Sequence, residues 1–133
     1  MITLHHAIKI AAPRSMVFLA LADVITMSKW HVGEVEGEIA LGKILTLHPK
    51  PGTHFSWRTE VLEPDSKIEQ TSVQETDSHA GKRLTFILSD LDDGQTLVKL
   101  SHGEWSEQDP HLPFCNTWWG EVLHHLKLYA EKA

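Results

Sequence analysis

The sequence is poor in cysteine, with one residue, Cys115, in a chain of 133. A single cysteine cannot form a disulfide within the chain, which excludes the small disulfide-stabilised scaffolds common among secreted proteins. The N-terminal segment MITLHHAIKI also lacks the basic start and the apolar run of a secretion signal. We therefore expect a cytoplasmic protein.

Basic residues and long apolar stretches are scarce as well. Lys and Arg number 12 against 18 Asp and Glu, which gives a formal net charge of −6. No basic stripe is available to neutralise a phosphate backbone, and no apolar run approaches the roughly 20 residues of a membrane-spanning helix. We expect a soluble protein with no nucleic acid and no membrane among its partners.

The rest of the composition is that of an ordinary folded domain. Hydrophobic residues make up 41% of the chain and charged residues 23%, and this length suits one domain spanning residues 1–133. Apolar residues alternate along residues 2–10, which predicts a strand with one buried face. Pro13 then begins a short helix that ends near Ala22, and Asp23 caps a second helical segment that ends near Trp30.

From residue 34 to residue 104 the chain consists of short alternating runs separated by turn residues, the pattern of an antiparallel meander. The predicted strands are Glu34–Leu41, Lys43–Pro49, His54–Leu62, Lys67–Glu75, Lys82–Leu91 and Thr96–Glu104. Apolar residues then return at helical spacing, which predicts a helix from roughly Asp109 to Glu131. The fold class is α+β: a curved antiparallel sheet of six to seven strands around a long C-terminal helix, with two short helices after the first strand.

The same periodicities predict which side chains face inward. Trp57 and Thr59 share the inward face of one strand, Phe86 faces inward from another, and His102 from the last. The apolar stripe of the C-terminal helix comprises Phe114, Cys115, Trp118, Trp119, Val122, Leu123, Leu126 and Tyr129. Because neighbours on a helix are about 100° apart, one of the adjacent tryptophans is expected inside and the other partly exposed.

Short motifs along the whole chain resemble one superfamily. They are Ile10-Ala11-Ala12-Pro13, Val17-Phe18-Leu19-Ala20-Leu21, Trp30, Gly37, Gly42, Trp57, Val61-Leu62-Glu63-Pro64, Thr96-Leu97-Val98-Lys99-Leu100-Ser101-His102-Gly103, Trp119, Leu123, Leu126-Lys127 and Tyr129. Together they look like the SRPBCC superfamily (START/Bet v 1-like), and within it the branch named for the C-terminal domain of activators of heat-shock-protein ATPase. The resemblance implies a helix-grip fold with a cavity between sheet and C-terminal helix. Members bind hydrophobic molecules, and some are cyclases, dehydratases or hydrolases.

The candidate ligand-binding residues are inward-facing side chains that would form the walls of such a cavity: Trp30, Trp57, Thr59, Phe86, His102, Cys115, Trp118 and Trp119. The ordinary alternative is that they only build the hydrophobic core. His102 is the best catalytic candidate, as an acid or base near neutral pH, against the favoured alternative of a histidine hydrogen-bonded within the core. Glu104 shares its parity and is a lesser polar candidate at the cavity mouth.

Other reactive groups are less promising. Cys115, near the start of a helix, is a conceivable nucleophile, but no spacing pairs it with a base, so a small apolar core residue is the favoured interpretation. The adjacent pairs His5-His6 and His124-His125 diverge and cannot chelate together. No metal and no cofactor are expected unless histidines distant in the sequence converge, the candidates being His48, His54, His102 and His111.

Three functions stay open. The leading one is binding of a small hydrophobic or amphipathic ligand in the cavity. The second is a small cyclase, dehydratase or hydrolase that uses His102 as acid or base. The third is a co-chaperone-type interaction module, the least favoured because chaperone activators of this branch carry a further N-terminal domain that is not expected here. A homodimer is left open beside a monomer.

Overall fold

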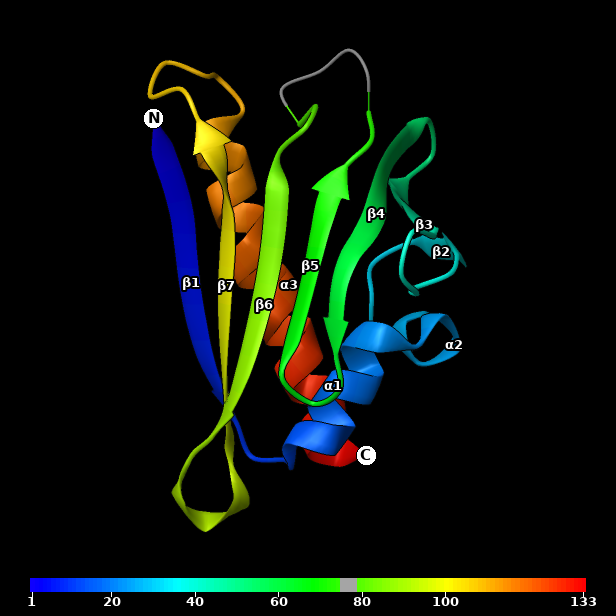
Figure 1. The fold of residues 1–133 in the computed structure, drawn as a ribbon, viewed down its shortest axis with the longest axis vertical. Coiled ribbons are helices and arrows are strands. Elements are labelled where there is room, and N and C mark those ends of the chain that lie inside the picture. Colours follow the sequence, from blue (N-terminus) through cyan, green and yellow to red (C-terminus); the bar gives the residue numbers. More distant parts are fainter. Residues whose placement is uncertain (75–78) are drawn as a thin grey trace.

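The computed structural model describes residues 1–74 and 79–133, which contain seven strands and three α-helices (Figure 1). In chain order they are β1 (Ile2–Ile10), α1 (Arg14–Ala22), α2 (Val24–Met27), β2 (Glu34–Gly37), β3 (Ile44–Lys50), β4 (Thr53–Glu63), β5 (Lys67–Ser72), β6 (Arg83–Asp90), the 3-10 turn η1 (Asp92–Gly94), β7 (Thr96–Trp105) and α3 (Leu112–Lys132). None of these helices is both long enough and apolar enough to cross a membrane.

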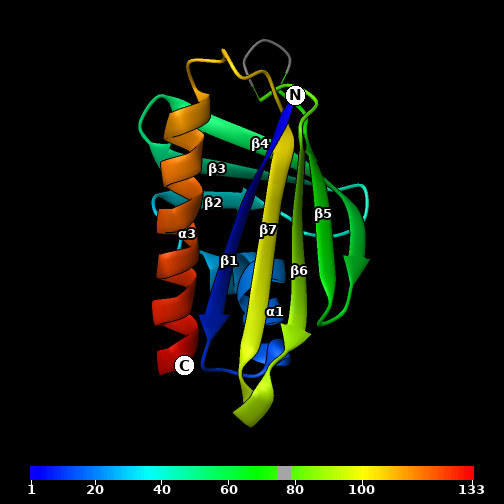
Figure 2. The ribbon, with the colours of Figure 1, turned by 90° about the vertical axis from the view of Figure 1, so that its left-hand side faces the viewer.

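All seven strands belong to one antiparallel sheet with the order β1-β7-β6-β5-β4-β3-β2. Figure 2 shows β1, β7 and β6 running along α3, whereas β2, β3 and β4 cross toward its N-terminal half. This turning follows from the twist that strands accumulate across a wide sheet. The predicted α+β helix-grip architecture is confirmed.

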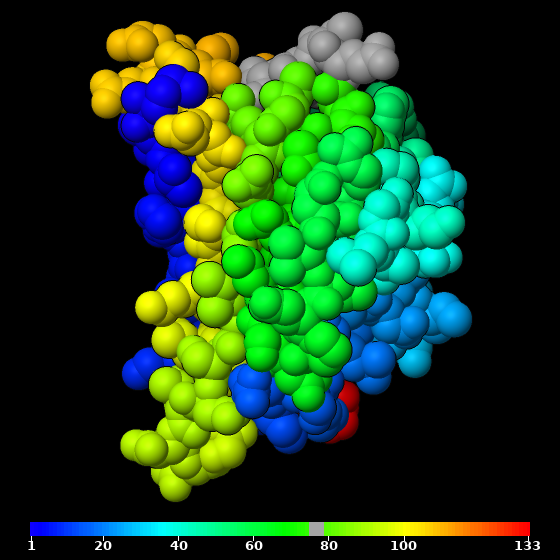
Figure 3. Space-filling view, viewed as in Figure 1, coloured from blue at the N-terminus to red at the C-terminus, as the bar shows by residue number. Residues whose placement is uncertain are grey.

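The core lies between the concave face of the sheet and α3. The face predicted from alternation is confirmed along β1, where Leu4 and Ile10 are buried while Thr3 and Lys9 are exposed. Viewed from the convex side, the sheet hides α3 except at its C-terminal end (Figure 3). The helix contributes the buried residues Cys115, Trp119, Val122, Leu123, Leu126 and Ala130.

Several predicted boundaries were wrong. The strand expected at Glu34–Leu41 ends at Gly37. The φ of Gly37 is +95°, and a Cβ atom at this position would lie only 2.2 Å from the carbonyl oxygen of Ile44, so only glycine fits here. The strand expected at Lys67–Glu75 ends at Ser72, and Glu75 lies outside the described residues.

The ends of the helices agree with the prediction in α2 but differ from it in α3. Asp23 caps α2 as predicted, since its carboxylate accepts from the backbone N–H of Thr26 at 3.0 Å. Helix α3 begins at Leu112, three residues after the expected Asp109. Phe114 was predicted on the buried stripe, but its side chain is 75% exposed. It lies in the first turn of the helix, one residue before the buried Cys115.

Polar contacts hold α3 on the edge strand β1. Lys127 donates to the carbonyl oxygen of Lys9 at 2.9 Å, and the backbone N–H of Ala11 donates to Glu131 at 2.8 Å. The hydrogen bond from Ala11, and then that from Lys127, lower the pKa of Glu131. These bonds attach the C-terminal half of the helix to the end of β1, and His6 of β1 lies 3.0 Å from Oδ1 of Asn116 in the N-terminal half.

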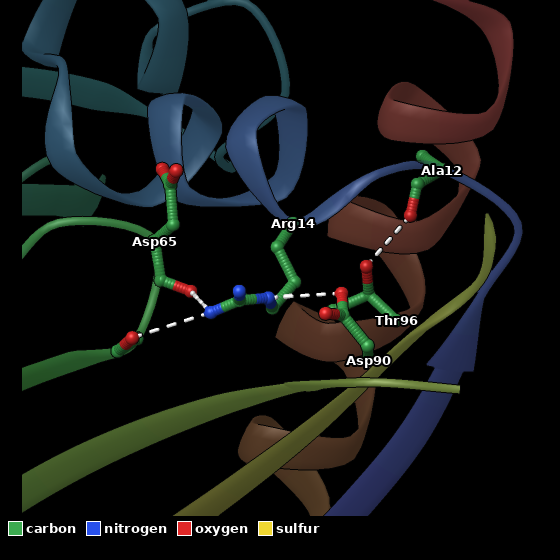
Figure 4. Close-up of polar contacts among 6 residues, drawn as sticks. Ala12, Arg14, Asp65, Asp90 and Thr96 are labelled. Atoms are coloured by element: carbon green, nitrogen blue, oxygen red, sulfur yellow. Dashed lines mark hydrogen bonds and ion pairs between the residues drawn. The ribbon is translucent and has the colours of Figure 1, made fainter.

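Arg14, the first residue of α1, joins three parts of the fold (Figure 4). Its guanidinium donates to Asp90 at the end of β6, to the carbonyl oxygen of Asp65 and to the hydroxyl of Ser66, at 2.9, 2.9 and 3.2 Å. A planar, permanently charged group can satisfy all three acceptors at once. Arg14 therefore anchors α1 to the turn between β4 and β5.

We expect Arg14→Ala to lower the free energy of unfolding by about 1–2 kcal/mol, because it removes two partly buried hydrogen bonds as well as an exposed ion pair. The matched control is Arg83→Ala, whose side chain is more exposed than that of Arg14 and whose ion pair with Glu69 is longer, 3.8 Å. Its effect should stay below about 0.5 kcal/mol. Urea unfolding of both variants measures the difference, and equal losses would show that Arg14 is an ordinary surface residue.

Candidate functional site

A cavity of about 530 Å³ lies between the β3–β4 hairpin and the first turns of α3. Its volume is within the range of pockets for small molecules, and most of its wall is apolar. The lining residues are Leu47, Pro49, Lys50, Thr53, Phe55 and Trp57 from the hairpin, His79, His111, and Phe114, Cys115, Trp118 and Trp119 from α3. The sheet and the helix therefore form the walls of a partly open space between them, as the resemblance implied.

Four of the predicted ligand-binding residues line this cavity: Trp57, Cys115, Trp118 and Trp119. The prediction that the adjacent tryptophans differ in exposure is confirmed, since Trp119 is buried and Trp118 is half-buried. Both nevertheless reach the cavity wall. Trp57 belongs to β4 and is 2% exposed.

Three other candidates lie in the core away from the cavity. Trp30 donates its indole N–H to the carbonyl oxygen of Ala20 at 2.9 Å and so packs against α1. Thr59, two residues beyond Trp57 on β4, is fully buried, and Phe86 lies in the middle of the sheet on β6. Alternation predicted the faces of Thr59 and Phe86 correctly but contains no information on the position of a residue along its strand.

His102 is fully buried on β7 and does not line the cavity either. Its Nδ1 accepts a hydrogen bond from Nε1 of Trp119 at 2.9 Å, so the imidazole proton lies on Nε2. The rings of Trp57, Trp105 and Trp119 surround it at centroid distances of 5.5, 5.3 and 5.4 Å. His102 thus lies behind the cavity wall and supports Trp119.

The surroundings of His102 keep it neutral. Burial, followed by the electrostatic effects of His79 and Lys82, lowers its pKa from 6.5 to about 3. Such a histidine is a very weak base near neutral pH, and in this position it has no direct contact with the cavity. The arrangement matches the ordinary alternative, a histidine hydrogen-bonded within the core.

Trp105 is a core residue that sequence reasoning missed. In the pairing of β1 with β7, Ile2 is opposite Trp105 and Leu4 is opposite His102, so β7 contains one extra residue there. Such a bulge reverses the parity that follows it. Trp105 is consequently buried and Glu104 exposed, and the prediction that Glu104 faces inward was wrong.

His79 is the second residue that was missed. Its Nε2 lies 3.2 Å from Sγ of Cys115, and its ring stacks on His102 at 6.0 Å with an interplanar angle of 21°. It also contacts Phe55 at a centroid distance of 4.8 Å. Thirty-six positions separate the two members of the sulfur–imidazole pair. No motif spacing could have joined them, because His79 lies outside the regular elements.

The histidines listed as possible metal ligands do not converge. His48 and His54 are neighbours at a centroid distance of 6.1 Å, and His48 pairs with Glu36 at 2.9 Å. His102 is buried in the aromatic layer instead. Over residues 1–74 and 79–133 no group of three His, Cys, Asp or Glu side chains is placed to hold a metal ion.

The buried His102 generates a prediction about pH. The unfolded chain takes up a proton on this side chain near pH 6.5, whereas the folded chain does so only near pH 3. The stabilising contribution of neutral His102 is therefore fully present above pH 6.5, and it decreases as the pH falls toward 3. Between pH 7.5 and pH 5 this group should lower the free energy of unfolding by about 2 kcal/mol.

Urea unfolding at the two pH values measures this loss. His102→Asn keeps an acceptor for Trp119 but cannot titrate, so its pH-dependent loss should be smaller by about 2 kcal/mol. His124→Asn, on an exposed position of α3, should behave as the wild type. Identical pH dependence in the wild type and His102→Asn would contradict the assignment. Burial also lowers the pKa of His31. Because both variants retain His31, its contribution to the pH dependence is the same in each.

Comparison with known proteins places this geometry in a family. The chain is similar in structure to the Aha1 dimer from Colwellia psychrerythraea, with 24% identity, a TM-score of 0.90, and coverage of 98% of this chain and 97% of that one. CalU16 from Micromonospora echinospora is 23% identical with a TM-score of 0.79, over 96% of this chain and 75% of that one. At these identities the likeness shows the fold alone. A comparison with curated proteins gives no match.

A third solved structure, an HSP90 activator from Plasmodium falciparum, is 16% identical with a TM-score of 0.79, over 96% of this chain and 95% of that one. The family model described as Activator of Hsp90 ATPase homolog 1-like protein matches residues 11–131, nearly the entire chain. The chain therefore belongs to this family, a branch of the SRPBCC superfamily.

Proposed function

We propose that the protein binds a small amphipathic molecule in the cavity between the β3–β4 hairpin and α3. The observation that carries this proposal is the cavity of about 530 Å³, lined by several aromatic side chains, in a domain of this size. The cavity is partly open to solvent, so a small molecule can enter it. Apolar walls of this extent favour a ligand with a hydrophobic body.

A polar group in the ligand is favoured by the donors in and near the wall. Trp57 lines the wall, while its Nε1 is buried beneath the surface and has no hydrogen-bond partner among the described residues. Lys50 and His111 also line the cavity and can donate hydrogen bonds.

The enzyme alternative that uses His102 as acid or base is less well supported. The ring is separated from the cavity by Trp57 and Trp119, and its pKa is lowered to about 3. The family's name refers to chaperone activation by relatives, and we do not extend that activity to this chain. A cytoplasmic location, inferred from the single cysteine, stays part of the proposal.

We expect a substitution that fills the cavity to weaken binding of a fluorescent amphiphile, anilinonaphthalene sulfonate. Thr53 is half-buried at the start of β4 and lines the cavity. Thr53→Trp should therefore raise the dissociation constant at least about tenfold, which is a loss of ~1.4 kcal/mol of binding free energy. Fluorescence titration at fixed pH measures the constant. Native mass spectrometry of protein taken directly from cells then identifies a co-purified molecule.

The matched control is Thr71→Trp on β5. Thr71 is opposite Arg58 and Arg83 on the outer face of the sheet, so its replacement adds the same side chain without entering the cavity. Its dissociation constant should equal that of the wild type. Equal binding by both variants would mean that the probe binds elsewhere and would remove the cavity from the proposal.

A homodimer is a further part of the proposal. The similar structure from Colwellia psychrerythraea is described as a dimer. In the present sheet β1 and β2 are the edge strands, and because Lys127 of α3 already donates to the carbonyl oxygen of Lys9 on β1, β2 is the edge we propose for pairing with a second copy. Light scattering coupled to gel filtration gives the mass in solution, and a mass equal to one chain would exclude a stable dimer.

A further inference from the structure

The contact between Cys115 and His79 lies in the cavity wall, where a bound molecule would meet it. Sγ and Nε2 are 3.2 Å apart, within hydrogen-bonding distance for sulfur. Cys115 is the fourth residue of a helix of 21 residues, so the positive end of the helix dipole favours a thiolate at this position. A nearby base and a favourable field are what convert a cysteine into a nucleophile.

Trp57 forms the wall of the same space on the side of the sheet. Trp57 lines the cavity opposite α3, is 2% exposed, and its Nε1–H has no acceptor among the described residues. Its ring centroid is 6.4 Å from that of Trp119, one helical turn beyond Cys115. Lys50 and His111, which also line the cavity, can donate a hydrogen bond to a ligand carbonyl oxygen, and such a bond stabilises the negative charge that appears there when a nucleophile adds.

We propose that Cys115 and His79 form a thiol–imidazole pair that adds covalently to α,β-unsaturated carbonyl compounds bound in the cavity. This inference rests on the proposed ligand-binding function, because the reactive carbon must first reach the sulfur. The apolar walls select hydrophobic members of this class. His79 acts as the base and then as the acid.

The step balances without an oxidant or a leaving group. The S–H proton of Cys115 passes to Nε2 of His79, and the sulfur forms a bond to the β-carbon of the enone. The π electrons of the carbon–carbon double bond move toward the carbonyl, whose oxygen becomes an enolate oxygen. The α-carbon then takes the proton from Nε2 of His79, which returns to its neutral state. The product is a thioether.

The probe is trans-3-nonen-2-one, an enone with an apolar tail, and its saturated analogue 2-nonanone is the unreactive match. Intact-mass spectrometry follows the addition of one probe mass, and the chain has only one cysteine to bear it. We expect the native protein to react at least about tenfold faster than the same protein unfolded in urea at the same pH. The rate should saturate with probe concentration, since binding precedes reaction.

Three variants assign the roles. Cys115→Ala should form no adduct, and His79→Gln should react at least about tenfold more slowly than the wild type. His124→Gln, on the exposed side of α3, should react as the wild type does. Circular dichroism establishes that each variant is folded. The comparison of native with urea-unfolded wild type provides the same test without any substitution.

The two proposals fail in distinguishable ways. If 2-nonanone displaces anilinonaphthalene sulfonate but the enone reacts no faster with native than with unfolded protein, the covalent step is overturned and ligand binding stands. If 2-nonanone does not displace the probe and no adduct forms, both are overturned. Displacement together with rapid, saturable labelling that requires His79 supports both.

Discussion

The hydrogen bond between Trp119 and His102 determines how α3 meets the sheet at the open end of the molecule. Both side chains are buried, so each polar nitrogen of the pair would be costly without the other. Their bond fixes the orientation of Trp119, whose ring with that of Trp57 forms the inner wall of the cavity. The neighbouring Trp118 then reaches the same space from the half-exposed side of the helix.

This arrangement gives His102 and His79 different environments. His102, enclosed by tryptophan rings, has its pKa lowered to about 3 and supports the wall as a neutral group. His79 stacks on it but lies on the cavity side, in contact with Cys115. A structural histidine and a chemically available one thus share one aromatic layer, and their difference in burial decides their roles.

Much of the fold could be predicted from the sequence because alternation and helical period report directly on burial. The same patterns identified Trp57, Cys115, Trp118 and Trp119, which do line the cavity. Parity could not place Thr59 along its strand, nor reveal the bulge that turns Trp105 inward and Glu104 outward. The contact of His79 with Cys115 depends on a segment outside the regular elements, where no period applies.

Whether the cavity binds a ligand is tested most directly by the five tryptophan indole N–H signals in a two-dimensional NMR titration with anilinonaphthalene sulfonate. Trp57 and Trp118 line the cavity, whereas Trp30 is bonded to Ala20 beside α1. The account predicts saturable shifts of the Trp57 and Trp118 signals with little change at Trp30. Shifts confined to Trp30, or no saturable shift at all, would contradict it.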